Sequence, residues 1–308
     1  MMNAIPPFYD PQRVGSLFYP EVAAIADHAA AAGLSPATDD KRQIHLLIID
    51  MQIDFCHPQG TLYVPGAEDD IRRLIGFIYR HAAQISKITC SLDSHLPLQI
   101  FHPAWWVDEN GRHPDPFTVI SAADVQAGRW RPRRSPDWSV QYVHKLEEAA
   151  KKALVIWPYH VPLGGIGNGL DPELWSAVFW HSIARQVQPN WWIKGTTPEV
   201  EHYSILKPEV PRPEQPQDVK GQAFLAELEK EDMLLIAGEA SSHCVLETVN
   251  DLVQAFADRP DMLNRFHILQ DCMSPVIHPE IDFAALAQAE YERFAQMGVH
   301  FINSDDPL

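Results

Sequence analysis

The sequence has few cysteines and no segment suited to crossing a membrane. Its four cysteines are spread widely over 308 residues, and no two of them form a CxxC pair. No run of 18 apolar residues occurs, and the first residues, MMNAIPP, carry no apolar stretch typical of a secretion signal. These absences argue against a disulfide scaffold and against a membrane protein, and we expect free thiols in a reducing cytoplasm.

Lysine and arginine are also scarce. The chain has 24 of them against 41 aspartates and glutamates, which gives a formal net charge of −17 at pH 7. A surface of this sign repels phosphate backbones and anionic lipids, so we expect no nucleic-acid or membrane partner. The hydrophobic content of 46% is enough for a sizeable core, and the length suits one large α/β domain or two small ones.

What the sequence does contain is an alternation of short apolar runs with amphipathic segments. We predict strands at residues 45–50, 85–92, 153–157, 190–194, 233–237 and 266–271. We predict helices at residues 20–32, 71–78, 172–186, 218–230, 243–257 and 280–297. This alternation is typical of a doubly wound, Rossmann-like α/β fold, in which helices cover both faces of a six-stranded, mostly parallel sheet.

Two segments fall outside this alternation. Residues 1–43 are rich in proline and alanine, and we interpret them as an N-terminal extension packed on the core or on a neighbour. Residues 44–308 then form one domain with an insertion at about 97–150, which holds several Trp, Pro and Arg residues with little periodicity. Loops of this length inside a compact domain are usually functional lids or insertions.

Several chemically active side chains stand near the ends of predicted strands. Asp50, Asp93 and Lys194 each follow or end a strand, and a Gly-containing turn leads from another strand to Cys244. His160 lies three residues past a further strand. Because ligands of doubly wound sheets bind beyond the carboxyl ends of the strands, we expect these side chains to share one rim.

Cys244 occupies the first turn of a predicted helix. There a thiol feels the positive end of the helix and its uncommitted N–H groups, which favour the thiolate and can hold an oxyanion. With Asp50 to accept and return a proton and Lys194 to stabilise negative charge, the three residues predict a nucleophilic cysteine. Taken singly, each has a simpler interpretation: a structural cysteine, a turn-capping carboxylate and a solvated lysine.

A second group combines a carboxylate with histidines. Asp93 and His95 have D-x-H spacing, His160 joins them, and His102 is an optional fourth ligand. Such donors suit one divalent ion such as Zn²⁺, Fe²⁺ or Mn²⁺, with an open coordination position for water or substrate. The alternative is that these histidines make ordinary loop hydrogen bonds, as we assume for most of the 15 histidines in the chain.

Five motifs occur in a fixed order along the chain. They are DMQIDFC at residues 50–56, DSH at 93–95, WPYH at 157–160, WIKG at 192–195 and ASSHCV at 240–245. Together they resemble the motifs of the isochorismatase-like cysteine hydrolases, and most closely those of the nicotinamidase (pyrazinamidase) branch. The resemblance covers residues 45–271, most of the chain, and implies the isochorismatase-like hydrolase fold.

The resemblance implies a role for each matched residue. Cys244 would attack the carboxamide carbon of nicotinamide, with Asp50 as the base and Lys194 as the charge partner. The backbone N–H groups of Ala240 and Cys244 would hold the oxyanion, beside a cis peptide bond between Glu239 and Ala240.

The same resemblance implies how the substrate ring is held. Asp93, His95 and His160 would bind one metal ion, which in this branch holds the pyridine nitrogen and water molecules. Phe55 and Trp157 match positions that flank the ring, and an aromatic sandwich suits a flat heteroaromatic substrate.

The implied function is a metal-assisted amidohydrolase that converts a small (hetero)aromatic carboxamide such as nicotinamide into the acid and ammonia through a thioester. A small-molecule amide as partner, a homo-oligomer and a place in NAD salvage follow from the same resemblance. Two alternatives stay open. The first is a hydrolase of the same fold acting on another amide or on a ureido or carbamoyl compound. The second is a non-catalytic binding protein, which is disfavoured because binding needs no thiol beside a base.

The chain departs from the family pattern in the stretch after His95, which is much longer than usual. A lid inserted there could reshape the pocket for a larger amide or exclude nicotinamide. His102 stands one residue further along than the third histidine of other family members, so its role as a ligand is open. The loop at 196–204 is also longer, and its polar side chains either reach the pocket mouth or, more simply, form a solvated rim: Glu199, Glu201 and His202.

Overall fold

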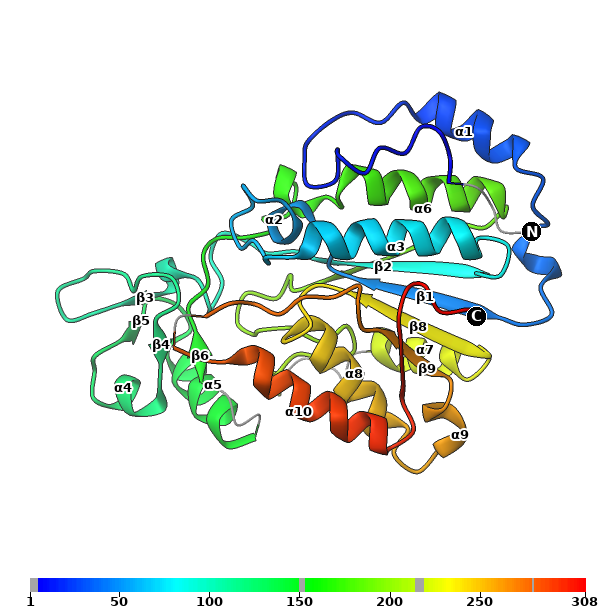
Figure 1. Cartoon of the computed structure of the whole chain (residues 1–308). Coiled ribbons are helices and arrows are strands. Elements are labelled where there is room, and N and C mark those ends of the chain that lie inside the picture. Colours follow the sequence, from blue (N-terminus) through cyan, green and yellow to red (C-terminus); the bar gives the residue numbers. More distant parts are fainter. Residues whose placement is uncertain (1–4, 150–152, 214–218, 279) are drawn as a thin grey trace.

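A six-stranded parallel sheet runs through the middle of the molecule (Figure 1). The computed structural model describes residues 5–149, 153–213, 219–278 and 280–308. The strands of the sheet are β1 (Ile44–Ile49), β2 (Lys87–Asp93), β7 (Asn190–Lys194), β8 (Met233–Gly238), β9 (Phe266–Leu269) and β10 (His300–Ile302). They lie in the order β10-β9-β8-β1-β2-β7, and every pairing between neighbours is parallel.

The strand order reverses between β1 and β8, which is the topological switch point of a doubly wound sheet. The chain runs outward from β1 through β2 to β7 on one side, and then from β8 through β9 to β10 on the other. At such a point the loops after the two central strands leave in opposite directions and open a crevice at the carboxyl ends. The topology therefore directs attention to the ends of β1 and β8.

Helices cover both faces of the sheet, as the sequence predicts (Figure 1). One face carries α3 (Ala67–His81) and α6 (Pro172–Ala184), with α1 (Val22–Ala31) outside them, and the other carries α7 (Val219–Leu228), α8 (Cys244–Ala255) and α10 (Phe283–Gln296). Short helical segments are η1 (Ala37–Asp39), α2 (Ile53–Cys56), η2 (Pro103–Trp105), η3 (Ile166–Asn168) and α9 (Pro260–Leu263). Among the described residues, no helix has both the length and the apolar character needed to span a bilayer.

Strand β1 shows why the sheet is covered on both sides. Its residues are all buried. Leu46 and Ile48 belong to the apolar cluster that includes α3 and α6, whereas Leu47 and Ile49 belong to the cluster that includes α8. A nearly continuous apolar run is the pattern expected of a parallel strand between two helical layers.

The N-terminal residues pack on the core. Val14, Ile25 and Ala29 belong to the same apolar cluster as α3 and α6. Arg185, which follows α6 and is 1% exposed, forms an ion pair with Asp40 in this segment. Packing on the core is thus observed, while the division of the chain into an extension and one domain stays a prediction.

One predicted strand lies outside the central sheet. The apolar run at 153–157 predicts a central strand, but it contains only the short strand β6 (Leu154–Val155), which pairs antiparallel with β4 (Val119–Ile120). That prediction is wrong because the run is buried in the apolar cluster of the insertion instead. The sixth strand is β10 at the sheet edge, which has only three, partly exposed residues and is therefore too short to show a clear strand pattern.

The insertion forms a lobe with an apolar core of its own, beside the end of the sheet at which β1 and β2 end (Figure 1). The lobe contains α4 (Ala122–Gln126), α5 (Pro136–Ala149) and a ribbon of β3 (Trp106–Val107) with β5 (Arg131–Pro132). Trp105, Trp106 and Tyr142 are fully buried in its apolar cluster. The same cluster includes Phe101 and Trp157, so the packing of the lobe positions a residue expected at the site.

Candidate active site

Four of the predicted site residues meet beside the switch point. Asp50 follows β1, and Cys244 is the first residue of α8, after the turn that leaves β8. The parallel register of β2 and β7 sets Asp93 opposite Lys194. The strand-end positions read from the sequence therefore bring these four side chains together.

The ammonium group of Lys194 lies at the centre of this group. Its Nζ is 2.9 Å from Asp50 Oδ2, 3.1 Å from Asp93 Oδ1 and 3.5 Å from Cys244 Sγ. All four residues are buried. Burying a charge is costly unless it is paired, so this lysine and the two carboxylates form one tightly coupled unit. The burial of Lys194 excludes its interpretation as a solvated lysine.

The protonation of this unit differs from the expected one. Burial raises the pKa of Cys244 well above its usual value, Lys194 opposes this effect, and Asp50 and Asp93 add to it. Burial also raises the pKa of Asp50, against the opposing charge of Lys194. The expectation of a thiolate favoured by the helix end is wrong for the resting protein, because burial and two carboxylates outweigh it. The thiol therefore keeps its proton at neutral pH and needs a base when it reacts.

Asp50 is held by a residue that sequence reasoning missed. The hydroxyl of Ser91 donates to Asp50 Oδ1 at 2.6 Å and accepts from the Asp50 backbone N–H at 3.1 Å. Asp50 has a φ of 48°, which is uncommon for a residue other than glycine, and this bond pair sets the direction of its carboxylate. Ser91 is a buried polar residue in the predicted neighbouring strand, but its partner appears only once the β1–β2 pairing is known.

The turn between β8 and α8 forms the wall beside the thiol. The peptide bond between Glu239 and Ala240 is cis, as the family resemblance implies. Gly238 has a φ of 137°, and a Cβ atom there would lie 2.1 Å from the carbonyl oxygen of Ile49, so only glycine permits this approach of β8 to β1. Ala240 and Cys244 both line the cavity onto which the thiol opens.

A buried carboxyl pair supports this turn from behind. Glu239 and Asp70 are 0% and 1% exposed. Glu239 accepts a hydrogen bond from the Ser274 backbone N–H at 3.1 Å, and Asp70 accepts from the Ser274 hydroxyl at 2.5 Å and from Arg73 at 2.6 Å. Burial first, and then the charge of Asp70, raise the pKa of Glu239 well above its usual value. The neutral acid is therefore the favoured form of Glu239 in the folded protein.

We expect Glu239→Gln to make the protein more resistant to alkaline pH. A carboxyl whose folded-state pKa is raised contributes full stability below its unfolded pKa of about 4.3 and loses that contribution as the pH rises through the folded pKa. Glutamine mimics the neutral acid at every pH. As the pH rises above about 4.3, and until the folded pKa is reached, the wild type should therefore lose up to about 1.4 kcal/mol of unfolding free energy per pH unit relative to the variant. Urea unfolding over this range measures the difference.

The control for this prediction is Glu109→Gln, which removes an exposed carboxylate of the lobe and should leave the pH slope of stability unchanged. If Glu239→Gln and the wild type showed the same slope, Glu239 would be ionised in the folded protein and the neutral form would be ruled out.

Three predicted ligand residues gather next to the ammonium centre. One ligand atom each of Asp93, His95 and His160 lies within 4.8 Å of the others, and all three residues are buried. The far ring nitrogens bond to backbone carbonyls, His160 Nδ1 to Pro158 O at 2.7 Å and His95 Nδ1 to Gly195 O at 3.3 Å. Such outer bonds orient the inner nitrogens of metal-binding histidines. A carboxylate with two imidazoles held in this way fits a divalent ion of the zinc type.

A second cluster of potential ligands is better explained by ion pairing. Ligand atoms of Asp50, Asp93 and Cys244 also lie within 4.8 Å of one another. However, Lys194 Nζ contacts all three, and an ammonium in that position excludes a second cation. His102 stands apart from both clusters.

His102 lies beside the three ligand residues without joining their group. Its ring centre is 5.9 Å from those of His95 and His160, and its two ring nitrogens are buried with no hydrogen-bond partner among the described residues. Burial first, and then His95, lower the pKa of His102 to about 4, so the ring is neutral. The role of His102 as a fourth ligand stays a prediction.

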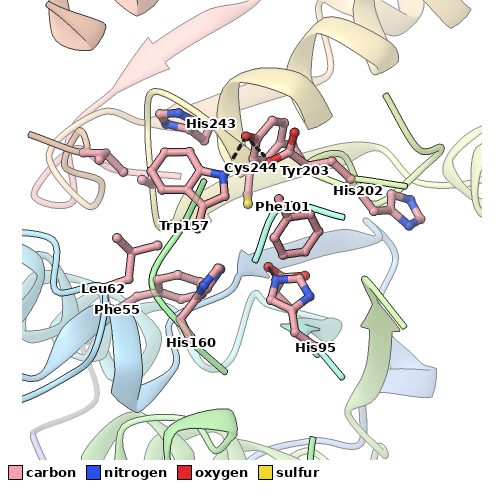
Figure 2. A pocket seen from close by; sticks show the side chains of 14 residues that line it. Phe55, Leu62, His95, Phe101, Trp157, His160, His202, Tyr203, His243 and Cys244 are labelled. Atoms are coloured by element: carbon pink, nitrogen blue, oxygen red, sulfur yellow. Dashed lines mark hydrogen bonds and ion pairs between the residues drawn. The ribbon is translucent and has the colours of Figure 1, made fainter. Parts of the chain in front are cut away.

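A small cavity opens onto the Cys244 sulfur. Its volume is about 40 Å³, where roughly 10–15 Å³ suffices for one water molecule on the same measure. Aromatic side chains form much of its wall: Phe55, Phe101, Trp157 and Tyr203. Figure 2 shows the sulfur directed toward the side on which His95 and His160 lie. The two residues expected to flank a substrate ring, Phe55 and Trp157, are thus both in the wall.

The loop at 196–204 contributes a buried carboxylate to this wall. Glu201 is 4% exposed, and its Oε1 accepts from Trp157 Nε1 at 2.8 Å and from the Tyr203 hydroxyl at 2.5 Å. The interpretation of Glu201 as part of a solvated rim is wrong, because the lobe covers this loop and takes Val200 into its apolar cluster. The apolar and aromatic neighbours Val200 and Tyr203 are the local signal that could have revealed the burial.

Comparisons with known proteins find similarity in structure only. No protein-family model and no curated protein matches the chain. A nicotinamidase/pyrazinamidase of Acinetobacter baumannii shares 17% identity over 88% of this chain and 100% of its own, with a TM-score of 0.57. The yeast nicotinamidase Pnc1p shares 16% identity over 85% and 100% of the two chains, also with a TM-score of 0.57.

A PnC1 structure from L. infantum in complex with nicotinate shares 18% identity over 86% of this chain and 94% of its own, with a TM-score of 0.51. At such identities the likeness is one of fold. The predicted fold class and the resemblance to nicotinamidases are confirmed at this level: the chain has the α/β fold of the nicotinamidases and pyrazinamidases.

Proposed function

We propose that the protein is a cysteine amidohydrolase that releases ammonia from a small carboxamide, with nicotinamide and pyrazinamide as the first candidates. The observation that carries the proposal is the buried contact of Lys194 with Asp50 and Cys244 at the switch point. This unit opens onto a small, largely aromatic cavity. A binding protein would have no use for a thiol buried between a base and an ammonium, whereas a nucleophilic hydrolase requires that combination.

The chemistry runs in two halves. Asp50 takes the proton of Cys244 as the sulfur forms a bond to the carboxamide carbon, and the ammonium of Lys194 balances the negative charge. The oxyanion is held by the backbone N–H groups of Ala240 and Cys244. Asp50 then passes the proton to the departing nitrogen, which leaves as ammonia. A water molecule, deprotonated by Asp50, hydrolyses the thioester, and the carboxylic acid leaves as the thiol is restored.

Asp93, His95 and His160 would hold one divalent ion beside this centre, with Zn²⁺, Fe²⁺ and Mn²⁺ as candidates. When bound, such an ion would offer an open coordination position to a ring nitrogen of the substrate or to a water molecule. Phe55 and Trp157 would flank the ring, because both line the cavity. A homo-oligomer, a cytoplasmic location and a place in NAD salvage belong to the same proposal.

Metal binding gives a prediction that does not depend on turnover. His95→Ala and His160→Ala should each lower Zn²⁺ affinity by at least about 100-fold, since even outer-shell partners of metal ligands cost 10–100-fold. His102→Ala should cost roughly tenfold or less, because its ring lies beside the ligand group and not within it. Competition with a chromophoric chelator measures all three. Equal losses for His102→Ala and His160→Ala would make His102 a fourth ligand.

The test of the proposed function is release of ammonia by the purified protein supplied with Zn²⁺, Fe²⁺ or Mn²⁺ in turn. We expect turnover of nicotinamide or pyrazinamide, with the corresponding acid as the second product. If neither is hydrolysed but another amide or a ureido compound is, the substrate assignment falls and the cysteine mechanism stands. If no amide in a broad panel yields ammonia, the proposed activity itself falls.

A further inference from the structure

Two segments of the chain supply the candidate metal ligands, and their backbones meet. Asp93 and His95 lie at the end of β2 and just after it, whereas His160 lies in the loop after β6. The His95 backbone N–H donates to the Val161 carbonyl at 3.1 Å, and the Leu163 N–H donates to the His95 carbonyl at 2.9 Å. This contact is an isolated bridge, so the relative position of the two segments depends on the side chains around it.

The backbone of Asp93 is paired by the side-chain amide of Gln52. The Asp93 N–H donates to Gln52 Oε1 at 2.8 Å, and Gln52 Nε2 donates to the Asp93 carbonyl at 2.7 Å. Gln52 is fully buried. Strand β1, the neighbour of β2, has already ended at Ile49. The amide therefore supplies at Asp93 the donor and the acceptor that β1 supplies along the preceding part of β2.

Asn168 joins this arrangement from a third segment, the end of η3. Its Nδ2 donates to the Asp93 carbonyl at 2.8 Å and to the Ser94 hydroxyl oxygen at 2.9 Å, and it lies 3.5 Å from the Val161 carbonyl oxygen. The Asn168 backbone carbonyl accepts from Gln52 Nε2 at 2.9 Å. One side-chain amide thus contacts both segments that carry the candidate ligands.

The close approach of η3 to α2 sets the position of Asn168. A Cβ atom on Gly167 would lie 2.1 Å from Asp54 Oδ2, so any side chain there would displace the buried Asp54 carboxylate. The same carboxylate accepts from the Val161 N–H at 2.6 Å. Val161 directly follows His160 and has a φ of 41°, an outlier for a β-branched residue that persists only where its surroundings enforce it.

Resting on the metal site of the proposed function, we propose that Asn168 is a positioning residue for the metal ligands. Together with Gln52 it ties the segment of Asp93 and His95 to the loop of His160, so that the three ligand atoms are brought together before an ion binds. Outer partners that fix the ligands in advance typically account for a 10–100-fold difference in metal affinity. Asn168 lies outside the five sequence motifs, and its role follows from the structure alone.

Asn168→Ala should lower Zn²⁺ affinity by about tenfold or more, measured by competition with a chromophoric chelator. All three ligands stay in place in the sequence, so the loss reports how they are held. Co²⁺ gives a spectroscopic measurement on the same variant. At saturating Co²⁺ its visible absorption should differ from that of wild type in position or intensity, because that absorption depends on coordination geometry. Gln52→Met, which leaves both backbone groups of Asp93 unpaired, should also lower Zn²⁺ affinity by about tenfold or more.

Two variants serve as controls, and both should keep the wild-type Zn²⁺ affinity and Co²⁺ absorption. Asn190→Ala removes an amide of the same kind, which donates to Thr89 Oγ1 at 3.4 Å from the first residue of β7. Leu263→Ala leaves a cavity in the core at α9, which lies at the end of the molecule away from the lobe (Figure 1), and should cost more stability than Asn168→Ala. An equal loss of affinity in Leu263→Ala would show that general destabilisation is the cause and would overturn the proposal.

The measurement does not depend on turnover. If Asn168→Ala binds Zn²⁺ within about twofold of wild type and leaves the Co²⁺ absorption unchanged, the positioning role is rejected, even in a protein that hydrolyses nicotinamide. If the wild type binds neither ion, the metal site falls and the role of Asn168 falls with it. If the affinity loss is found but no amide yields ammonia, the amidohydrolase is rejected and the positioning role stands.

Discussion

Cys244→Ala should lower kcat for amide hydrolysis by about 10⁵-fold or more, as removal of a nucleophile from a coupled catalytic unit does in hydrolases. The reason is specific to this site. Asp50 and Lys194 would keep their 2.9 Å ion pair, but no atom would be left to form the thioester. The substrate should still bind, so the loss belongs to kcat. Single-turnover ammonia release with the alanine variant in excess over substrate measures it.

Cys272→Ala is the matched control for this variant. Cys272 is a free, fully buried thiol in the apolar cluster that includes α3 and α6, and its truncation costs packing without removing a group of the proposed catalytic unit. It should keep kcat within about threefold of wild type even where it lowers stability. Retained turnover in Cys244→Ala would reject every mechanism that forms a thioester on this cysteine.

Covalent trapping adds a second measurement on the same residue. Because burial and the neighbouring carboxylates raise the pKa of Cys244, the free thiol should react slowly with iodoacetamide at neutral pH, and more slowly than an exposed cysteine. Mass spectrometry of protein quenched in acid during turnover should instead show an acyl adduct on the Cys244 peptide. The absence of such an adduct, in an active protein, would contradict the two-step scheme.

The proposed nucleophile and its partners are predictable from the sequence because strand ends of a parallel sheet converge. Asp50, Lys194 and Cys244 lie far apart in the chain, yet each stands next to an apolar run that pairs with a neighbour in the sheet. The strand pattern alone is sufficient to bring them to one rim. The same reasoning wrongly assigns the run that contains β6 to the central sheet, because a short apolar run can equally be buried in the core of the lobe.

The parts of the site that escape prediction depend on burial by distant segments. Glu201 lies in a mostly polar, proline-containing loop, in which Val200 and Tyr203 are the only local signs of burial. It is buried because the lobe covers that loop and supplies Tyr142, from nearly sixty residues earlier, as a partner. Ser91 is similar, since only the pairing of β1 with β2 reveals that its hydroxyl serves Asp50. Sequence periodicity reports which face of an element is apolar, not which loop lies over it.

Lys194→Met should destabilise the fold by about 3–5 kcal/mol as well as stop turnover, because it leaves two buried carboxylates with no ammonium between them. Asp50 and Asp93 both face Lys194 Nζ, at 2.9 and 3.1 Å. Methionine fills a volume similar to that of lysine, so packing is kept. The change in unfolding free energy then measures the loss of the positive charge. Urea unfolding at neutral pH in the presence of EDTA measures it, since a divalent ion on Asp93 would mask part of the loss.

Arg259→Met is the control, because it breaks the ion pair of Arg259 with Asp261 at 2.9 Å, in which both side chains are about half exposed, at 48% and 54%. Exposed pairs contribute little to stability, so this variant should unfold close to wild type. Adding Asp50→Asn to Lys194→Met should then restore part of the lost stability, by removing one of the two uncompensated carboxylates. If the double variant were less stable than Lys194→Met, the ammonium would not be the group that allows both carboxylates to be buried. Turnover should stay abolished in the rescued protein, since Asp50 would no longer accept the thiol proton, and stability and catalysis would thereby be shown to rest on the same buried charges.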